Sequence, residues 1–87
     1  MDGFAVRHRD SRGASRQNHK TLEVIEDLPA GRVAKKSVRS LQAIRIMTGA
    51  PLPKGADSVI MVEEIKNVSG EGEKEFIQIY KEVRQGE

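Results

Sequence analysis

A ten-residue loop rich in proline and glycine separates two runs of apolar, largely β-branched residues in the segment RIMTGAPLPKGADSVIMVEE. A hairpin between two neighbouring strands needs only two to five loop residues. Pro51 and Pro53 hold the residues before them in extended conformations, and the glycines on either side permit sharp changes of direction. Residues 48–57, the arch, are therefore expected to form a stiff, extended connection.

The arch has groups that suit an anionic ligand. Gly49 and Gly55 offer backbone amides, and the Thr48 hydroxyl and the side chains of Arg45 and Lys54 could face a phosphate or another oxyanion. The structural alternative is a long loop that is packed by its leucine and closed by an aspartate that caps a turn. The residue types alone leave both interpretations open.

Strand-forming residues dominate the rest of the chain. It has seven isoleucines and eight valines against four leucines, and β-branched residues favour strands over helices. Strands are predicted at residues 4–6, 21–25, 43–47, 58–62 and from 76 onward. The third and fourth are expected to be buried on both faces and the last to have a solvated edge, with Gly70 and Gly72 in a hairpin turn before it.

Two segments show few strand signals. Residues 7–20 contain only Ala14 as an apolar residue and are expected to be a mobile loop. In residues 32–42 the apolar positions and the cations fall on opposite helical faces, which fits a short amphipathic helix. A pattern this short fits an irregular connection equally well. The fold class expected is mainly β, a β-rich α+β lobe of several strands with long loops and room for one short helix.

Composition excludes several kinds of site. Cysteine is absent, which excludes disulfides and thiolate metal sites and suits a reducing cytoplasm. No run approaches the roughly 20 apolar residues of a membrane span, so the cytoplasm is the expected location and no membrane partner is expected. His8 and His19 lie eleven residues apart in a polar segment, and neither is expected to ligate a metal or to act as a general base.

Charge is divided unevenly along the chain. Residues 1–50 contain ten Lys or Arg and five Asp or Glu, whereas residues 51–87 contain five and eight. A small, partly basic β domain could bind single-stranded nucleic acid, but such sites expose several aromatic rings. Here only Phe4, Phe76 and Tyr80 are aromatic and at least two are needed inside, so nucleic acid is the poorer alternative. A protein-interaction module is a third class.

Two motifs resemble the signatures of one protein family. Residues 1–7, MDGFAVR, and residues 45–57, RIMTGAPLPKGAD, followed by an apolar strand and Glu63, are similar to signatures of the MoeA family. That family includes the E domain of gephyrin and the plant molybdenum insertases. Between the motifs, residues 22–31, LEVIEDLPAG, resemble the family's strand that ends in Pro-Ala-Gly. The pieces occur in the family's order and at about its spacing.

The resemblance implies a place in a larger protein. Ser40 and Leu41 stand where the family usually has a Pro-Gly pair, which leaves room for the helix considered above. The family's usual segment before the first motif is missing, and the chain stops where the family continues. We therefore expect residues 1–87 to be a single β-rich lobe, resembling domain II of the MoeA N-terminal region, excised from a longer multidomain protein.

The resemblance also implies a chemistry. Family members are molybdopterin molybdotransferases, enzymes of molybdenum cofactor biosynthesis that insert molybdate into adenylylated molybdopterin and release AMP in a magnesium-dependent step. The resemblance also implies a homodimer. In this family the active cleft lies between domain II of one subunit and further domains of the other. The expected partners are therefore molybdopterin-AMP, molybdate, the remaining domains and a second subunit. This chain alone would supply one wall of the cleft and be inactive.

Six positions match the family's motifs closely enough to take a predicted role. Asp2 and Thr48 are the catalytic candidates, and the Asp2 carboxylate is also a possible Mg²⁺ ligand. The structural alternatives are a turn-forming aspartate and a threonine that ends a strand. The remaining four are expected to bind the cofactor or to shape the arch around it: Arg45, Gly49, Gly55 and Asp57.

Overall fold

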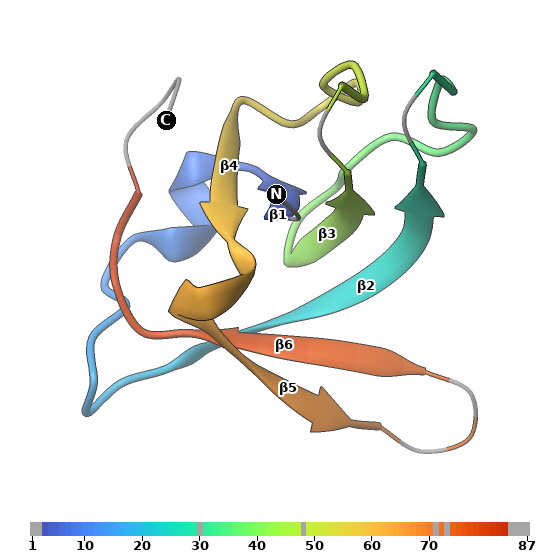
Figure 1. The fold of residues 1–87 in the computed structure, drawn as a ribbon. Coiled ribbons are helices and arrows are strands. Elements are labelled where there is room, and N and C mark those ends of the chain that lie inside the picture. Colours follow the sequence, from blue (N-terminus) through green and yellow to red (C-terminus); the bar gives the residue numbers. More distant parts are fainter. Residues whose placement is uncertain (1–2, 30, 48, 71, 73, 84–87) are drawn as a thin grey trace.

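The computed structural model describes residues 3–29, 31–47, 49–70, 72 and 74–83. Its elements form one curled, six-stranded sheet in the order β4-β1-β3-β2-β6-β5 (Figure 1). The strands are β1 (Gly3–Val6), β2 (Lys20–Leu28), β3 (Gln42–Ile46), β4 (Ser58–Met61), β5 (Ile65–Ser69) and β6 (Glu75–Ile79). Two short 3-10 helices are present in this part of the chain, η1 (His8–Ser11) and η2 (Val62–Glu64). The strand-dominated fold confirms the expected fold class.

The arch is long because the two strands that it joins are not neighbours. β1 pairs antiparallel with β3, with Gly3 opposite Ile46, and antiparallel with β4, with Gly3 opposite Met61. β3 and β4 therefore run in the same direction with β1 between them. A connection between them must cross two strand spacings, about 10 Å, and return along the strand length. A hairpin turn cannot do this, which explains the ten residues in structural terms.

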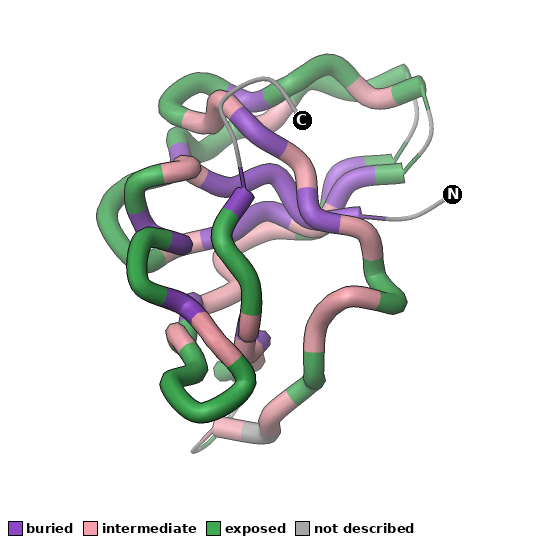
Figure 2. The backbone as a smooth tube through the Cα atoms, turned by 90° about the vertical axis from the view of Figure 1, so that its left-hand side faces the viewer, coloured by how far each residue is buried: buried purple, intermediate pink, exposed green. Residues whose placement is uncertain are grey.

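A second crossover lies beside the first. β2 and β3 pair in parallel, so the chain between them must also return along the sheet. Both connections cover one face of the sheet and meet where the Val38 amide donates to the Lys54 carbonyl at 2.8 Å. Figure 2 shows mostly exposed residues along these connections and buried residues on the strands beneath. The apolar cluster under them consists of Ala5, Leu28, Val38, Ile44 and Ile46.

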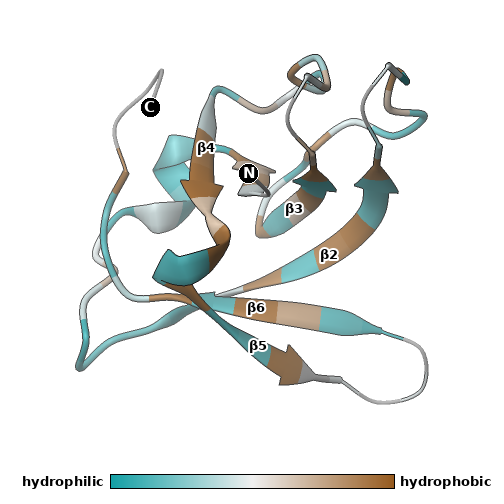
Figure 3. Ribbon diagram, viewed as in Figure 1, coloured by the Kyte–Doolittle hydropathy of each residue, from teal (hydrophilic) through white to brown (hydrophobic). Residues whose placement is uncertain are grey.

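The opposite face of the sheet curls around the larger apolar cluster. Phe4 and Leu22 are fully buried there, in contact with isoleucines of β4 and β6. Figure 3 shows β4 as largely apolar, whereas η1 and the loop after it are polar. The members of this cluster are Phe4, Val6, Ala14, Leu22, Ala43, Ile60, Ile77, Ile79 and Val83. In the described part of the chain, no helix is both long and apolar enough to span a bilayer.

The possible helix at residues 32–42 does not form. The segment is an irregular connection that ends at β3. An α-helix needs each amide to bond to the carbonyl four residues earlier, but here the amides are used elsewhere. Those of Lys35 and Lys36 donate to the Glu26 carboxylate at 3.1 and 3.0 Å, and that of Val38 donates to the arch.

Three strand predictions also need correction. β4 is not buried on both faces, because Ser58 and Ile60 are buried while Val59 and Met61 are half-buried. β6 has no free edge, since it lies between β2 and β5. β5 itself was not predicted, because its sequence, IKNVS, has little apolar alternation. It nevertheless pairs with β6 in the antiparallel hairpin expected around Gly70.

The polar segment at residues 7–20 is partly packed. Asp10 and Ser11 are buried within η1, against the expectation of a mobile loop. The Ser11 hydroxyl donates to the His8 carbonyl at 2.7 Å and accepts from the Val83 amide at 2.9 Å. The Asp10 carboxylate accepts from the Leu41 amide at 3.0 Å. Hydrogen bonds to distant residues, together with the burial of Ala14 in the core, hold this segment.

Gly55 is expected to be the least replaceable glycine of the two connections. Its φ is +88°, and a Cβ there would lie 2.2 Å from the Val38 carbonyl oxygen. Gly55→Ala should therefore lower the free energy of unfolding by about 3 kcal/mol, from backbone strain and overpacking together. Urea denaturation followed by circular dichroism measures this change.

Gly31→Ala is the matched control. Gly31 has a φ of +81° but nothing within 4 Å of an added Cβ, so only the strain of about 1 kcal/mol should appear. Equal losses in the two variants would show that contact with Val38 does not constrain the arch.

Candidate functional site

The sheet brings the two sequence motifs together. Gly3 of the first motif pairs with Ile46 of the second, and Phe4 pairs with Arg45. Because the pairing is antiparallel, the chain leaves the sheet at the same end before Gly3 and after Ile46. The two catalytic candidates, Asp2 and Thr48, lie outside the described residues.

Gly3 is required by the close approach of β4. A Cβ at this position would lie 2.9 Å from both the Ile60 carbonyl oxygen and Val59 Cγ1. Real Cβ atoms are not found this close to a backbone oxygen, so any larger residue would push β1 and β4 apart. The glycine of the first motif therefore fixes the position of β1 between its two neighbours.

Two glycine corners shape the arch as predicted. Gly49 and Gly55 have φ angles of +91° and +88°, and each lies beside a turn. The Ala50 amide donates to the carbonyl of Met47 at 3.0 Å, and a second turn precedes Asp57. Among residues 49–57, the described part of the arch, the buried residue is Pro53, whereas Leu52 is 49% exposed. The proline rather than the leucine therefore packs the loop.

Asp57 joins the end of the arch to η1. Its carboxylate accepts from the His8 amide at 2.8 Å, and its second oxygen lies 2.6 Å from His8 Nδ1. The Ser58 hydroxyl donates to Oδ1, the oxygen that also accepts from the His8 amide, at 3.0 Å. Burial acts to raise the pKa of Asp57, but the hydrogen bonds from His8 and Ser58 outweigh it and lower the pKa below its usual value. This contact agrees with the capping role considered for Asp57.

The His8–Asp57 pair was missed by the sequence analysis. The residues are 49 positions apart, and His8 stands in a polar segment without a recognisable motif. Only the antiparallel pairing of β1 with β4, which places Val6 opposite Ser58, brings them together.

Arg45 is held by two carboxylates. Its guanidinium donates to Asp27 at 3.0 Å and to both oxygens of Glu75, and its charged carbon lies 5.2 Å from the centroid of the Phe4 ring. Burial acts to lower the pKa of Arg45, but hydrogen bonds and charge from Glu75 and Asp27 outweigh it and raise the pKa. Arg45 thus ties β3 to β2 and β6. Its partner Glu75 lies 30 positions away in the sequence and was not predicted.

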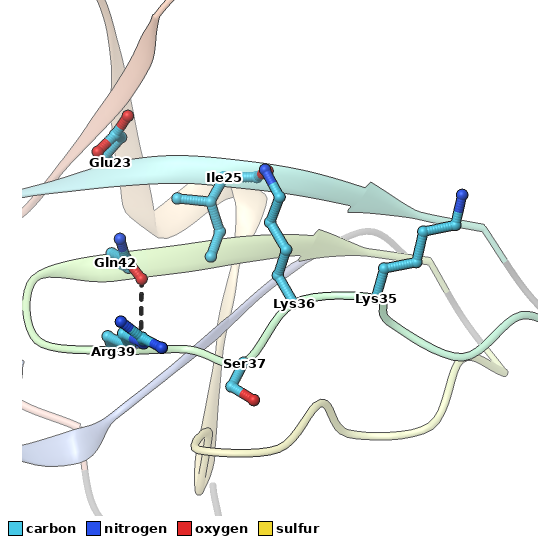
Figure 4. A pocket seen from close by; sticks show the side chains of 7 residues that line it. All are labelled: Glu23, Ile25, Lys35, Lys36, Ser37, Arg39 and Gln42. Atoms are coloured by element: carbon cyan, nitrogen blue, oxygen red, sulfur yellow. Dashed lines mark hydrogen bonds between the residues drawn. The ribbon is translucent and has the colours of Figure 1, made fainter.

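The side chains of Lys35 and Lys36 line two grooves, of which the second lies beside the arch. A groove of about 580 Å³ opens over β2 and β3, and Lys35, Lys36 and Arg39 line one side of it (Figure 4). A second groove of about 480 Å³ lies between this segment and the arch, with Leu52 and Lys54 in its lining. The surface next to the arch is therefore positive and partly apolar.

Glu26 fixes the shape of this cationic segment. The hydrogen bond from the Lys35 amide has the largest effect and lowers the pKa of Glu26. Burial acts to raise this pKa, but the hydrogen bond from the Lys36 amide and the charges of both lysines add to the lowering and outweigh burial. The ammonium of Lys36 also donates to the Ile25 carbonyl at 3.3 Å.

Metal-binding groups are not gathered in this part of the molecule. Within the described ranges, no cluster of three or more His, Cys, Asp or Glu side chains could hold a metal ion. Glu63, which matches the family motif, is exposed in η2. The described residues alone therefore do not fit a Mg²⁺ site.

The fold and the joined motifs define a small β lobe that presents loops from one end of a curled sheet. A family model described as the MoeA N-terminal region (domain I and II) matches residues 1–87. The chain belongs to this family, which confirms the resemblance seen in the motifs.

Relatives and solved structures agree with this assignment. The chain is 43% identical over 86 residues to the molybdopterin molybdenumtransferase of Bacillus subtilis (strain 168), covering 99% of the chain and 20% of that protein. It is 54% identical over 63 residues to the enzyme of that name from Staphylococcus epidermidis, covering 72% of the chain and 15% of that protein. A crystal structure of the molybdopterin biosynthesis moeA protein from Pyrococcus horikoshii OT3 matches with a TM-score of 0.84 at 42% identity, covering 99% of the chain and 21% of that structure. The chain thus spans about a fifth or less of the length of these proteins.

Asp57 is expected to stabilise the fold in a pH-dependent way. Its pKa is lowered in the folded state from an ordinary value of 3.8, so its contribution is complete at neutral pH and is lost as the pH falls through that value and then through the folded pKa. Asp57→Asn should cost about 1 kcal/mol at pH 7. The difference from the parent chain should shrink below about pH 4, as measured by urea denaturation across a pH series.

Glu63→Gln is the control for this series, since Glu63 is exposed and should change stability little at any pH. A difference between parent and Asp57→Asn that stays constant down to pH 3 would contradict the role of the Asp57 charge.

Arg45 and Glu75 are expected to be energetically coupled. A double-mutant cycle with Arg45→Met and Glu75→Gln should give a coupling of about 1 kcal/mol, because the pair is partly exposed. The same cycle with Arg12→Met, an exposed arginine, in place of Arg45→Met should give no coupling. Additive effects of Arg45→Met and Glu75→Gln would mean that the guanidinium does not link β3 to β6.

Proposed function

We propose that this chain acts as one lobe of a molybdenum insertase, an enzyme of molybdenum cofactor biosynthesis. The reaction is the insertion of molybdate into adenylylated molybdopterin with release of AMP. The observation that supports this proposal most directly is the family match over all of residues 1–87, together with relatives named molybdopterin molybdenumtransferase. In the whole enzyme the lobe supplies one wall of the active cleft.

Each motif residue has a distinct role in this proposal. The Thr48 hydroxyl donates to a phosphate or molybdate oxygen, and the Asp2 carboxylate orients a water or a metal-bound group. Arg45 positions β3, from which the arch begins, through its contacts with Asp27 and Glu75. Gly49, Gly55 and Asp57 set the path of the arch beside the bound cofactor.

The proposed metal site and the rest of the cleft involve groups beyond the described residues. We propose that any Mg²⁺ is held by Asp2 together with groups outside the described part of the chain. Further domains and a second subunit complete the cleft in a homodimeric enzyme of the cytoplasm. The positive surface around Lys35, Lys36 and Lys54 is consistent with anionic substrates.

A chimera tests the proposal. The 86 residues of the Bacillus subtilis relative that match this chain are replaced by it, and molybdate insertion and AMP release are measured by mass spectrometry. The chimera should be active, and Thr48→Ala or Asp2→Asn within it should each lower the rate about a hundredfold. Thr48→Ser, which keeps the hydroxyl, should retain most of the activity.

The control is Lys74→Gln, an exposed position before β6, which should leave the rate unchanged. A folded but inactive chimera, or full activity after both Thr48→Ala and Asp2→Asn, would contradict the proposal. Insertion of molybdate by the chain alone would contradict its role as a single wall.

A further inference from the structure

The outer face of the sheet gathers polar side chains from three strands near the start of β2. Thr21 lies opposite Gln78 in one ladder, and Gln78 lies opposite Lys66 in the next. Directly opposed side chains share a face of the sheet, so these three form a row across β2, β6 and β5. Ile77 and Ile79 project to the other face, into the core. The row is thus held in place by paired strands rather than by a loop.

A pocket of about 340 Å³ opens beside this row, lined by Arg16, His19, Lys66 and Tyr80. The rings of His19 and Tyr80 have centroids 5.7 Å apart and planes inclined by 51°. His19 Nδ1 lies 3.3 Å from Gln78 Oε1, which orients the imidazole. The two rings therefore form an angled platform, although they are far apart in the sequence.

The charge of the pocket favours an anion. Two of its four lining residues, Arg16 and Lys66, are cations, and none is a carboxylate. Within the described ranges neither cation forms an ion pair. A bound anion would be attracted by both cations, since no carboxylate in the lining neutralises them.

The aromatic ring of Tyr80 at the pocket has different surroundings from the other two aromatic rings of the chain. Phe4 is completely buried in the core, and the Phe76 ring lies against the backbone of Gly70. Tyr80 is the third aromatic residue of the sequence, and its ring lies beside both a second planar ring and open space.

We propose that this pocket binds a planar ring that bears a phosphate group, such as a nucleoside monophosphate. The ring stacks on Tyr80 and His19, and the phosphate accepts hydrogen bonds from Arg16 and Lys66. The pocket is shallow and widely open to solvent, so a bound nucleotide would remain partly exposed. The pocket lies at the start of β2, whereas the arch lies beyond its other end (Figure 1), and the proposal does not rest on the insertase function.

Amide NMR of the isotope-labelled chain tests the proposal. AMP is titrated in one series, and adenosine and inorganic phosphate are titrated separately in two others. AMP should shift the amides of His19, Lys66, Gln78 and Tyr80 in a saturable manner. It should bind about tenfold more tightly than either adenosine or phosphate, because only AMP makes both kinds of contact.

Variants separate the two contacts. Tyr80→Leu should weaken AMP binding about tenfold, and Tyr80→Phe, which keeps the ring, should not. Lys66→Gln should weaken AMP binding and leave adenosine binding unchanged, while Lys74→Gln, an exposed lysine elsewhere, should affect neither.

Three results would overturn the proposal. The first is the absence of AMP-dependent shifts around the pocket. The second is equal affinity for adenosine and AMP. The third is an affinity for single-stranded oligonucleotides that exceeds that for AMP and rises with their length, which would assign a nucleic-acid surface instead. Each can occur whether or not the insertase chimera is active.

Discussion

The position of β1 between β3 and β4 is the constraint on which the rest of the structure depends. Because β1 bonds to both strands, β3 and β4 must run in the same direction and cannot be joined by a short turn. The long arch, its glycine corners and its contact with the neighbouring connection all follow from this arrangement. The same pairing places the first motif beside the second at the register of Gly3 and Ile46. Fold and candidate site therefore have one common origin.

Local sequence properties were sufficient to predict much of the fold. The positions of five of the six strands, the hairpin near Gly70 and the glycine corners of the arch are each encoded by a few adjacent residues. The order of the strands is not encoded locally, so the burial of β4 and the interior place of β6 could not be read from alternation. The segment at 32–42 shows the same limit, because its helical pattern is overridden by bonds from its amides to Glu26 and to the arch.

The candidate site, like the fold, could be predicted from the sequence only in part. The motifs around Thr48 and Asp2 are contiguous in sequence and were recognised directly. Contacts between residues far apart in the sequence were not predicted, because no motif near His8 or Arg45 indicates their partners, Asp57 and Glu75. Such partners become visible only after the register of the sheet is known, and register depends on the whole chain.

The central position of β1 also has a consequence for synthesis on the ribosome. β1 cannot pair with the whole of β4 until Met61 has been made, 55 residues after Val6 (61 − 6). At typical rates of translation this is a delay of about 3–10 s. During that time an apolar strand, GFAV, has at least one unpaired edge and can associate with other chains. The charged and polar segment that follows it directly supplies nearby positive charge, which opposes such association while the nascent chain waits for its partners.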